Sequence, residues 1–137
     1  MKKVLFDTNI ILDIALKRNP FFNDAFKLFE LIDDKTITGI ITATTVTDIY
    51  FISKKERGHQ EAIHFLNNLM GVVDIIGVDK EVIIHALELE LSDFEDAVQI
   101  SASEFNEIEI IVTRNKSDFV NTPLKIFTPN EFLKSGV

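Results

Sequence analysis

Four aspartates in separate segments of the sequence are the residues best suited to carry chemistry. They are Asp7, Asp48, Asp96 and Asp118. Asp7 stands out because it ends the apolar run of residues 4–6, and a buried carboxylate is costly unless it is paired, hydrogen-bonded or bound to a cation. Carboxylates gathered in one cleft repel one another, and Mg²⁺ or Mn²⁺ relieves that repulsion because both ions prefer oxygen ligands. We therefore predict a shared Mg²⁺ or Mn²⁺ site, whose natural chemistry is phosphoryl transfer to water.

Helix capping is the alternative explanation for several of these acids. Three pairs have the residue types of a helix start, namely Thr45-x-x-Asp48, Ser92-x-x-Glu95, and Asn115 with Asp118. Capping explains Asp7 and Asp96 least. With Ser92 as the cap, Asp96 is the fourth helical residue and lies beyond the unpaired backbone amides of the first turn. These two aspartates are therefore the strongest candidates for a functional role.

The order of the expected elements determines where the acids lie. Strand-like apolar runs occur at residues 4–6, 38–43, 72–78, 108–113 and 125–128. Helical periodicity occurs between them, at residues 10–17, 22–32, 46–55, 62–69, 82–87 and 92–105. Such alternation indicates a parallel sheet that is covered on both faces. We predict an α/β fold, a three-layer α/β/α sandwich with a central parallel sheet of four or five strands, in which ligands bind at the carboxyl ends of the strands.

Composition limits the remaining possibilities. At 137 residues and 46% hydrophobic content, residues 1–137 are expected to form a single domain. The absence of cysteine excludes disulfides and thiolate metal sites. No apolar stretch approaches the roughly 20 residues that span a bilayer, so we expect no membrane association and a cytoplasmic protein. A net charge of −8 argues against a broad, nonspecific grip on nucleic acid, because lysine and arginine contacts with phosphate usually supply that affinity.

Four segments together resemble the PIN domain family, which comprises metal-dependent ribonucleases and includes the VapC toxins of bacterial toxin–antitoxin pairs. The segments are FDTNIILD (residues 6–13), TVTDIY (45–50), DFEDAVQISAS (93–103) and IVTRNKSDF (111–119). They follow the order and roughly the spacing of the family, and the resemblance covers nearly the whole chain. It implies a PIN-like fold, Mg²⁺- or Mn²⁺-dependent hydrolysis of RNA, an antitoxin protein as partner and a homodimer.

The resemblance also implies roles for individual residues. By motif, the catalytic acids are Asp7, Asp48, Asp96 and Asp118, and all except Asp48 are expected to ligate the metal directly. Supporting roles beside the site are implied for Thr8, Asn9, Asp93, Thr113 and Asn115. Two cations in the last motif, Arg114 and Lys116, are candidates for contacts with RNA phosphate, and a solvated loop is the alternative for both.

Two other functions compete with a nuclease. A catalytically inactive PIN-like interaction module is one, because Asp48 is one methylene shorter than the glutamate common in the family and Asn115 stands where many members have aspartate. A phosphorelay receiver is the other, since it shares the length, the α/β alternation and an acidic Mg²⁺ site. Receivers, however, need adjacent acids after the first strand and a lysine at the end of the last one. Here Asp7 stands alone, and Lys125 opens its strand.

Overall fold

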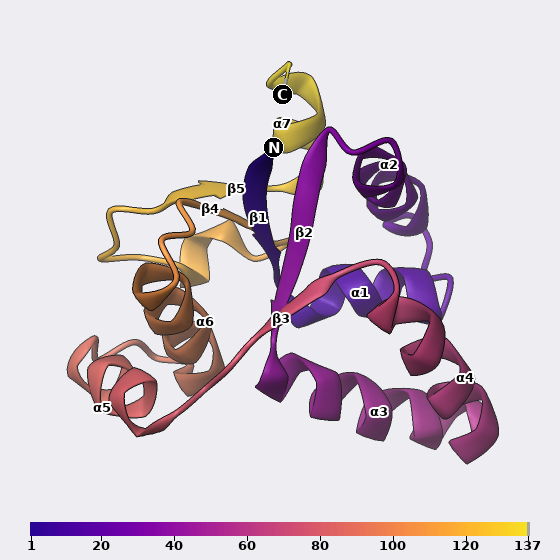
Figure 1. Ribbon diagram of the computed structural model, residues 1–137, viewed down its shortest axis with the longest axis horizontal. Helices are drawn as coiled ribbons and strands as arrows, with labels where there is room; N and C mark the ends of the chain where they lie inside the picture. Colours follow the sequence, from indigo (N-terminus) through magenta and orange to yellow (C-terminus); the bar gives the residue numbers. More distant parts are fainter. Residues whose placement is uncertain (137) are drawn as a thin grey trace.

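Five parallel strands form the centre of the molecule in the computed structural model, which describes residues 1–136 (Figure 1). The strands are β1 (Lys2–Phe6), β2 (Ile37–Thr42), β3 (Asp74–Ile76), β4 (Ile110–Val112) and β5 (Lys125–Phe127). Their order across the sheet is β3-β2-β1-β4-β5, and every neighbouring pair is parallel. The predicted parallel sheet of four or five strands is confirmed.

Helices cover both faces of this sheet. They are α1 (Thr8–Ala15), α2 (Phe22–Asp33), α3 (Ala43–Arg57), α4 (His59–Met70), α5 (Lys80–Glu88), α6 (Phe94–Phe105) and α7 (Pro129–Lys134), with a short 3₁₀ turn η1 (Lys116–Asp118). In Figure 1, α5 and α6 lie on the left of the sheet, and α1 to α4 lie on its right. This arrangement confirms the predicted three-layer α/β/α sandwich. Among residues 1–136, no helix is long and apolar enough to cross a membrane.

Two hydrophobic clusters separated by the sheet explain why the strand sequences are continuously apolar. Val4 and Phe6 of β1 point into the cluster beneath α1, α2, α3, α4 and α7, whereas Leu5 points into the cluster beneath α6. Successive strand side chains face opposite sides of a sheet, so a strand that is covered on both faces needs apolar residues at every position. The apolar runs recognised in the sequence are therefore the signature of this double burial.

The boundaries of several elements differ from the predicted ones. The run at residues 72–78 contributes only the three residues of β3. Helix α3 begins at Ala43 rather than at residue 46, because the Thr42 side chain accepts a hydrogen bond from the Thr45 amide and caps the helix. The predicted helices do not include α7. Its signal is nevertheless local, since Thr128 and Glu131 form a complete capping box around Pro129.

Candidate active site

An acidic cavity of about 270 Å³ lies at the carboxyl edge of the sheet. All four predicted catalytic acids line it: Asp7, Asp48, Asp96 and Asp118. Four of the five predicted supporting residues also line it: Thr8, Asn9, Asp93 and Asn115. These side chains come from the start of α1, from α3, from the start of α6 and from the loop after β4. The fold thus brings together acids that are far apart in the sequence.

Asp7 is held at the end of β1 by contacts from two other elements. Its backbone N–H donates to the Val112 carbonyl oxygen at 3.0 Å, which ties it to β4. Its Oδ1 accepts a hydrogen bond from Gln99 Nε2 at 3.0 Å, and its Oδ2 accepts one from Thr113 Oγ1 at 2.7 Å. Although Asp7 occupies the N-cap position of α1, its side chain makes no capping hydrogen bond. Capping therefore does not account for this buried carboxylate.

Thr113 and Gln99 both act on Asp7 from outside the lining of the cavity. Thr113 was predicted as a supporting residue beside the site, and its hydroxyl donates a hydrogen bond to Asp7. Gln99 was not predicted, although it lies in the motif segment 93–103. Its side chain is 0% exposed and lies one helical turn after Asp96 on α6. The spacing of three residues places both side chains on one face of the helix, which is the only local signal that points to Gln99.

Asp96 is the most electrostatically stressed acid of the cavity. It is 9% exposed, and its pKa is raised to about 8, first by burial and then by the negative charges of Asp7, Asp93, Asp118 and Glu95. The N-cap of α6 is Asp93, whose side chain accepts a hydrogen bond from the Asp96 amide at 3.2 Å. The Ser92 cap considered in the sequence is therefore wrong, and Asp96 is the third helical residue, not the fourth.

Glu95 is an acid of the cavity that the sequence analysis treated only as part of a capping box. Its Oε1 accepts a hydrogen bond from Thr8 Oγ1 at 2.9 Å. Its pKa is raised to about 7, first by burial and then by a hydrogen bond with the Asp48 side chain. The capping box of Thr45 with Asp48 does not form either, because Thr42 is the cap of α3 and the Thr45 hydroxyl lies 2.9 Å from that of Thr8. Asp48 and Glu95 are therefore neighbours in the lining of the cavity.

The two predicted phosphate-binding cations lie outside the lining of this cavity. Lys116 Nζ pairs with Glu131 at 3.2 Å on the surface. Arg114 Nε lies 3.1 Å from Asp13 Oδ2, and its guanidinium stacks over the Phe21 ring, with Cζ 3.9 Å from the ring centroid. Both residues lie in the segment between β4 and η1 or at its end, on either side of Asn115. They are therefore neighbours of the cavity and not part of its wall.

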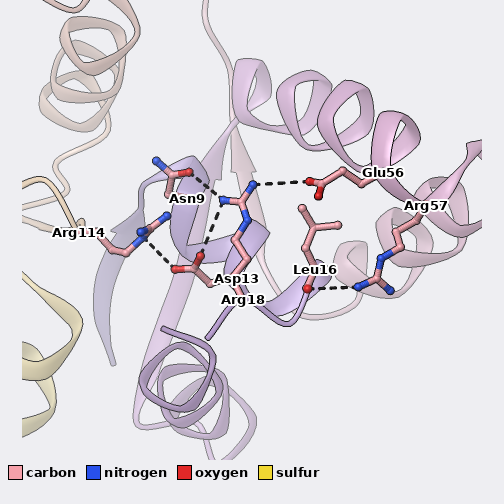
Figure 2. A network of polar contacts seen from close by, with 7 residues as sticks. All are labelled: Asn9, Asp13, Leu16, Arg18, Glu56, Arg57 and Arg114. Carbon is pink, nitrogen blue, oxygen red and sulfur yellow. Dashed lines mark hydrogen bonds and ion pairs between the residues drawn. The ribbon is translucent and has the colours of Figure 1, made fainter. Parts of the chain in front are cut away.

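Asp13 is the centre of a second polar network, which includes Asn9, Arg18 and Arg114 (Figure 2). It is 1% exposed, and burial raises its pKa against the opposing effect of Arg114 and Arg18. Arg18 Nη1 lies 3.9 Å from Asp13 Oδ1 and donates to Asn9 Oδ1 at 3.4 Å. Because Asn9 lines the acidic cavity, this network connects the buried Asp13 to the site.

The donor set of the cavity fits a hard cation. Every ionisable side chain that lines it is a carboxylate, and the pKa values of Asp96 and Glu95 are raised first by burial and then by neighbouring carboxylates. No three acidic or histidine side chains in that range already converge as a complete ligand set. Mg²⁺ commonly takes one or two carboxylates and keeps several waters, so it does not require such a cage.

The sequence matches the family model of the PIN domain over residues 3–117, and the chain belongs to the PIN domain family. A fold with a parallel sheet and an acidic cavity at its carboxyl edge agrees with that membership. The receiver interpretation is therefore wrong. A comparison with curated protein sequences gives no match.

Solved structures of toxin–antitoxin proteins share the fold. VapBC2 from Rickettsia felis, bound to a DNA fragment from its promoter, has a TM-score of 0.70 at 18% identity and covers 90% of this chain and 96% of its own. A toxin–antitoxin complex from Klebsiella pneumoniae has a TM-score of 0.69 at 23% identity, with coverages of 92% and 97%. VapC20 from Mycobacterium tuberculosis, described as a sarcin–ricin loop cleaving toxin, has a TM-score of 0.65 at 15% identity, with coverages of 79% and 86%.

Proposed function

We propose that this protein is a Mg²⁺- or Mn²⁺-dependent ribonuclease that hydrolyses phosphodiester bonds of RNA, and that it is the toxin of a toxin–antitoxin pair. The observation that carries the proposal is the acidic cavity, where burial and the neighbouring carboxylates together raise the pKa of Asp96 to about 8. A site that tolerates such repulsion is suited to a cation, and perturbed pKa values cluster at functional sites. Membership of the PIN domain family supports the same chemistry.

The residues of the cavity divide into direct ligands and residues that position them. Asp7, Asp96 and Asp118 would hold the ion, which when bound would activate a water molecule and shield the charge of the scissile phosphate. Asp7 is oriented for this role by the hydrogen bonds from Gln99 and Thr113. Asp48 tunes the site from α3, paired with Glu95. Carboxylates that folding has already oriented lower the activation barrier of hydrolysis, because they need not reorganise during the reaction.

Cleavage of RNA by the purified protein tests the proposal. Protein freed of any copurified partner is expected to cleave RNA with Mg²⁺ or Mn²⁺, and a chelator is expected to abolish the cut. Asp7→Asn and Asp96→Asn should each lose ~100-fold or more in rate, which is roughly 3 kcal/mol of transition-state stabilisation. The double variant should lose little more, because both residues act through one ion. Asp33→Asn, which removes an exposed acid at the end of α2, is the matched control and should keep full activity.

Two results would contradict these assignments in different ways. Full activity of Asp96→Asn would remove Asp96 from the site and make Asp93 the next residue to test. A wild-type protein that is inert on RNA with either metal, yet binds an antitoxin-like protein, would favour the interaction module.

We further propose an antitoxin protein as partner and a homodimer, on the strength of the shared fold with toxin–antitoxin complexes. An open reading frame for a small antitoxin beside the gene, and light scattering of the purified protein, test these two points.

A further inference from the structure

A second cavity, which we call the Phe21 pocket, adjoins the loop after β4. Its volume is about 360 Å³, and its walls include Pro20, Phe21, Asp24, Arg114, Pro129 and Asn130. This volume is within the range of about 300–1,000 Å³ that is common for ligand sites in proteins. Two proline rings and an aromatic ring supply apolar surface, and one guanidinium supplies positive charge. No role described so far for the metal site uses this pocket.

Arg114 is held in a fixed position on the wall of this pocket. Its side chain is 22% exposed, its Nε lies 3.1 Å from the buried carboxylate of Asp13, and its Cζ lies 3.9 Å from the centre of the Phe21 ring. Figure 2 shows Arg114 turned toward Asp13 on α1. These two contacts use Nε and one face of the guanidinium, so the Nη groups stay available to donate hydrogen bonds to an anionic ligand. Stacking and a fork of N–H donors are properties that lysine does not share.

The Phe21 pocket and the acidic cavity share one segment of chain. Arg114 lines the pocket, the next residue Asn115 lines the cavity, and the preceding residue Thr113 donates a hydrogen bond to Asp7. On α1, Asp13 anchors Arg114, and one turn earlier Asn9 lines the cavity. The two cavities are therefore adjacent, as sites for successive units of one polymer would have to be.

We infer that the Phe21 pocket binds one nucleotide of the RNA strand next to the cleaved bond, with its base on the apolar wall and its phosphate on Arg114. This inference rests on the proposed ribonuclease function. Single-stranded RNA is recognised by stacking of its bases on aromatic rings and on arginine planes. A purely electrostatic contact with RNA would not need the apolar wall. Acidic residues outnumber lysine and arginine in this protein of net charge −8, so charge alone gives it a weak hold on RNA. Asp24 and Asn130 offer polar groups for the edge of the base.

Binding of short oligoribonucleotides with one abasic position tests this inference. The protein carries Asp96→Asn to prevent cleavage, and affinity is measured by fluorescence anisotropy as the abasic position is moved along the strand. One position is expected to weaken binding more than the others. Phe21→Ala should lower the affinity for intact RNA by about 5- to 150-fold, the range for loss of one stacked base, and should erase the effect of that abasic position.

Matched variants separate the pocket from general effects. Arg114→Gln should lower the affinity, and Arg114→Lys should not restore the dependence on the abasic position, because lysine keeps the charge without the plane and the Nε contact. Phe105→Ala, which removes a 55% exposed phenylalanine at the end of α6, and Lys80→Gln at the exposed start of α5 are controls that should leave both measurements unchanged. Phe21→Leu keeps apolar burial without the ring, and it replaces Phe21→Ala if that variant does not fold.

Each remaining outcome assigns the failure to one claim. If Phe21→Ala and Arg114→Gln bind RNA like the parent protein while the wild type cleaves it, the inference is wrong and the proposed function stands. If the wild type neither binds nor cleaves RNA, the proposed function fails and the inference fails with it. If Phe21→Ala weakens only the binding of a copurifying antitoxin, the pocket is a protein contact and the inference is overturned.

Discussion

Gln99 illustrates at the scale of one residue how the acidic site is built. It is buried, its amide donates to Asp7 Oδ1, and its own Oε1 has no hydrogen-bond partner within residues 1–136. An amide buried in this way is costly because its acceptor is left unsatisfied. The benefit lies in the orientation of Asp7. Residues that hold the ligands of a metal typically change metal affinity by 10–100-fold when they are replaced.

Replacing Gln99 by leucine is expected to separate metal affinity from stability. Gln99→Leu removes a hydrogen bond to a carboxylate, worth about 1.5–3 kcal/mol, and it also removes an unsatisfied acceptor that costs about 1–3 kcal/mol. These effects have opposite sign, so the free energy of unfolding in urea should change little. Affinity for Mn²⁺, measured by calorimetry, should fall by about 10–100-fold.

Ser103→Ala is the matched control for this prediction. Its hydroxyl is also buried on α6, and it has no hydrogen-bond partner within residues 1–136. The variant should therefore keep the metal affinity of the wild type. Unchanged affinity in Gln99→Leu as well would show that Gln99 only fills space.

The packing of α2 on β2 is the feature at the scale of elements that is most sensitive to one substitution. Gly39 lies in β2 beneath α2, and a Cβ atom there would lie 2.5 Å from Ile32 Cδ1 and 2.9 Å from Phe6 Cε2. Phe6 is fully buried in the cluster on this face of the sheet. Glycine at this position lets the helix approach the sheet closely. The same sheet carries Asp7 one residue after Phe6, so the site depends on this layer.

Gly39→Ala is expected to lower the free energy of unfolding by about 1–3 kcal/mol, the usual cost of overpacking a core. A shift of the denaturant midpoint without a change in slope would measure it. Gly77→Ala is the control, because a Cβ there meets no atom within 4 Å. It should be neutral or slightly stabilising, by up to about 1 kcal/mol. Equal midpoints for the two variants would mean that Ile32 and Phe6 move aside without cost.

At the scale of the whole molecule, the charge of the acidic cavity should govern how stability depends on pH. Folding raises the pKa of Asp96 to about 8 and that of Glu95 to about 7, whereas the unfolded values are about 3.9 and 4.3. Between these limits the folded state binds more protons than the unfolded state. Stability therefore falls as the pH rises, and the loss is complete only above the folded pKa values.

Thermal unfolding of the metal-free protein is expected to show this trend. The melting temperature should fall from pH 5.5 to pH 8.5, and Mg²⁺ or Mn²⁺ should raise it more at pH 8.5, because protons compete with the metal and the ion binds the folded state. Asp96→Asn should flatten the pH dependence and reduce the effect of metal, which assigns both effects to this residue. A melting temperature of the metal-free wild type that rises with pH would contradict the assigned repulsion.

The sequence by itself determined the layers of the fold and every acid of the cavity except Glu95. Apolar runs such as residues 108–113 identify doubly covered strands because burial on both faces demands apolar residues at each position. Asp7 stood out because an acid at the end of such a strand needs a partner. Predictions of this kind depend only on neighbouring residues. The predicted cap at Ser92 was therefore wrong, because the adjacent Asp93 is also a good cap and is the N-cap of α6.

Only the tertiary structure decided which side chains meet. Gln99 of α6 donates a hydrogen bond to Asp7 at the end of β1. Glu95 lies beside Asp48 in the cavity lining, and Asp13 pairs with Arg114 at the edge of the Phe21 pocket. No periodicity encodes these pairs, because periodicity reports which face of an element is buried and not which element covers it. The parallel sheet supplies that information by bringing the carboxyl ends of β1, β2 and β4 to one edge, where residues distant in sequence become neighbours.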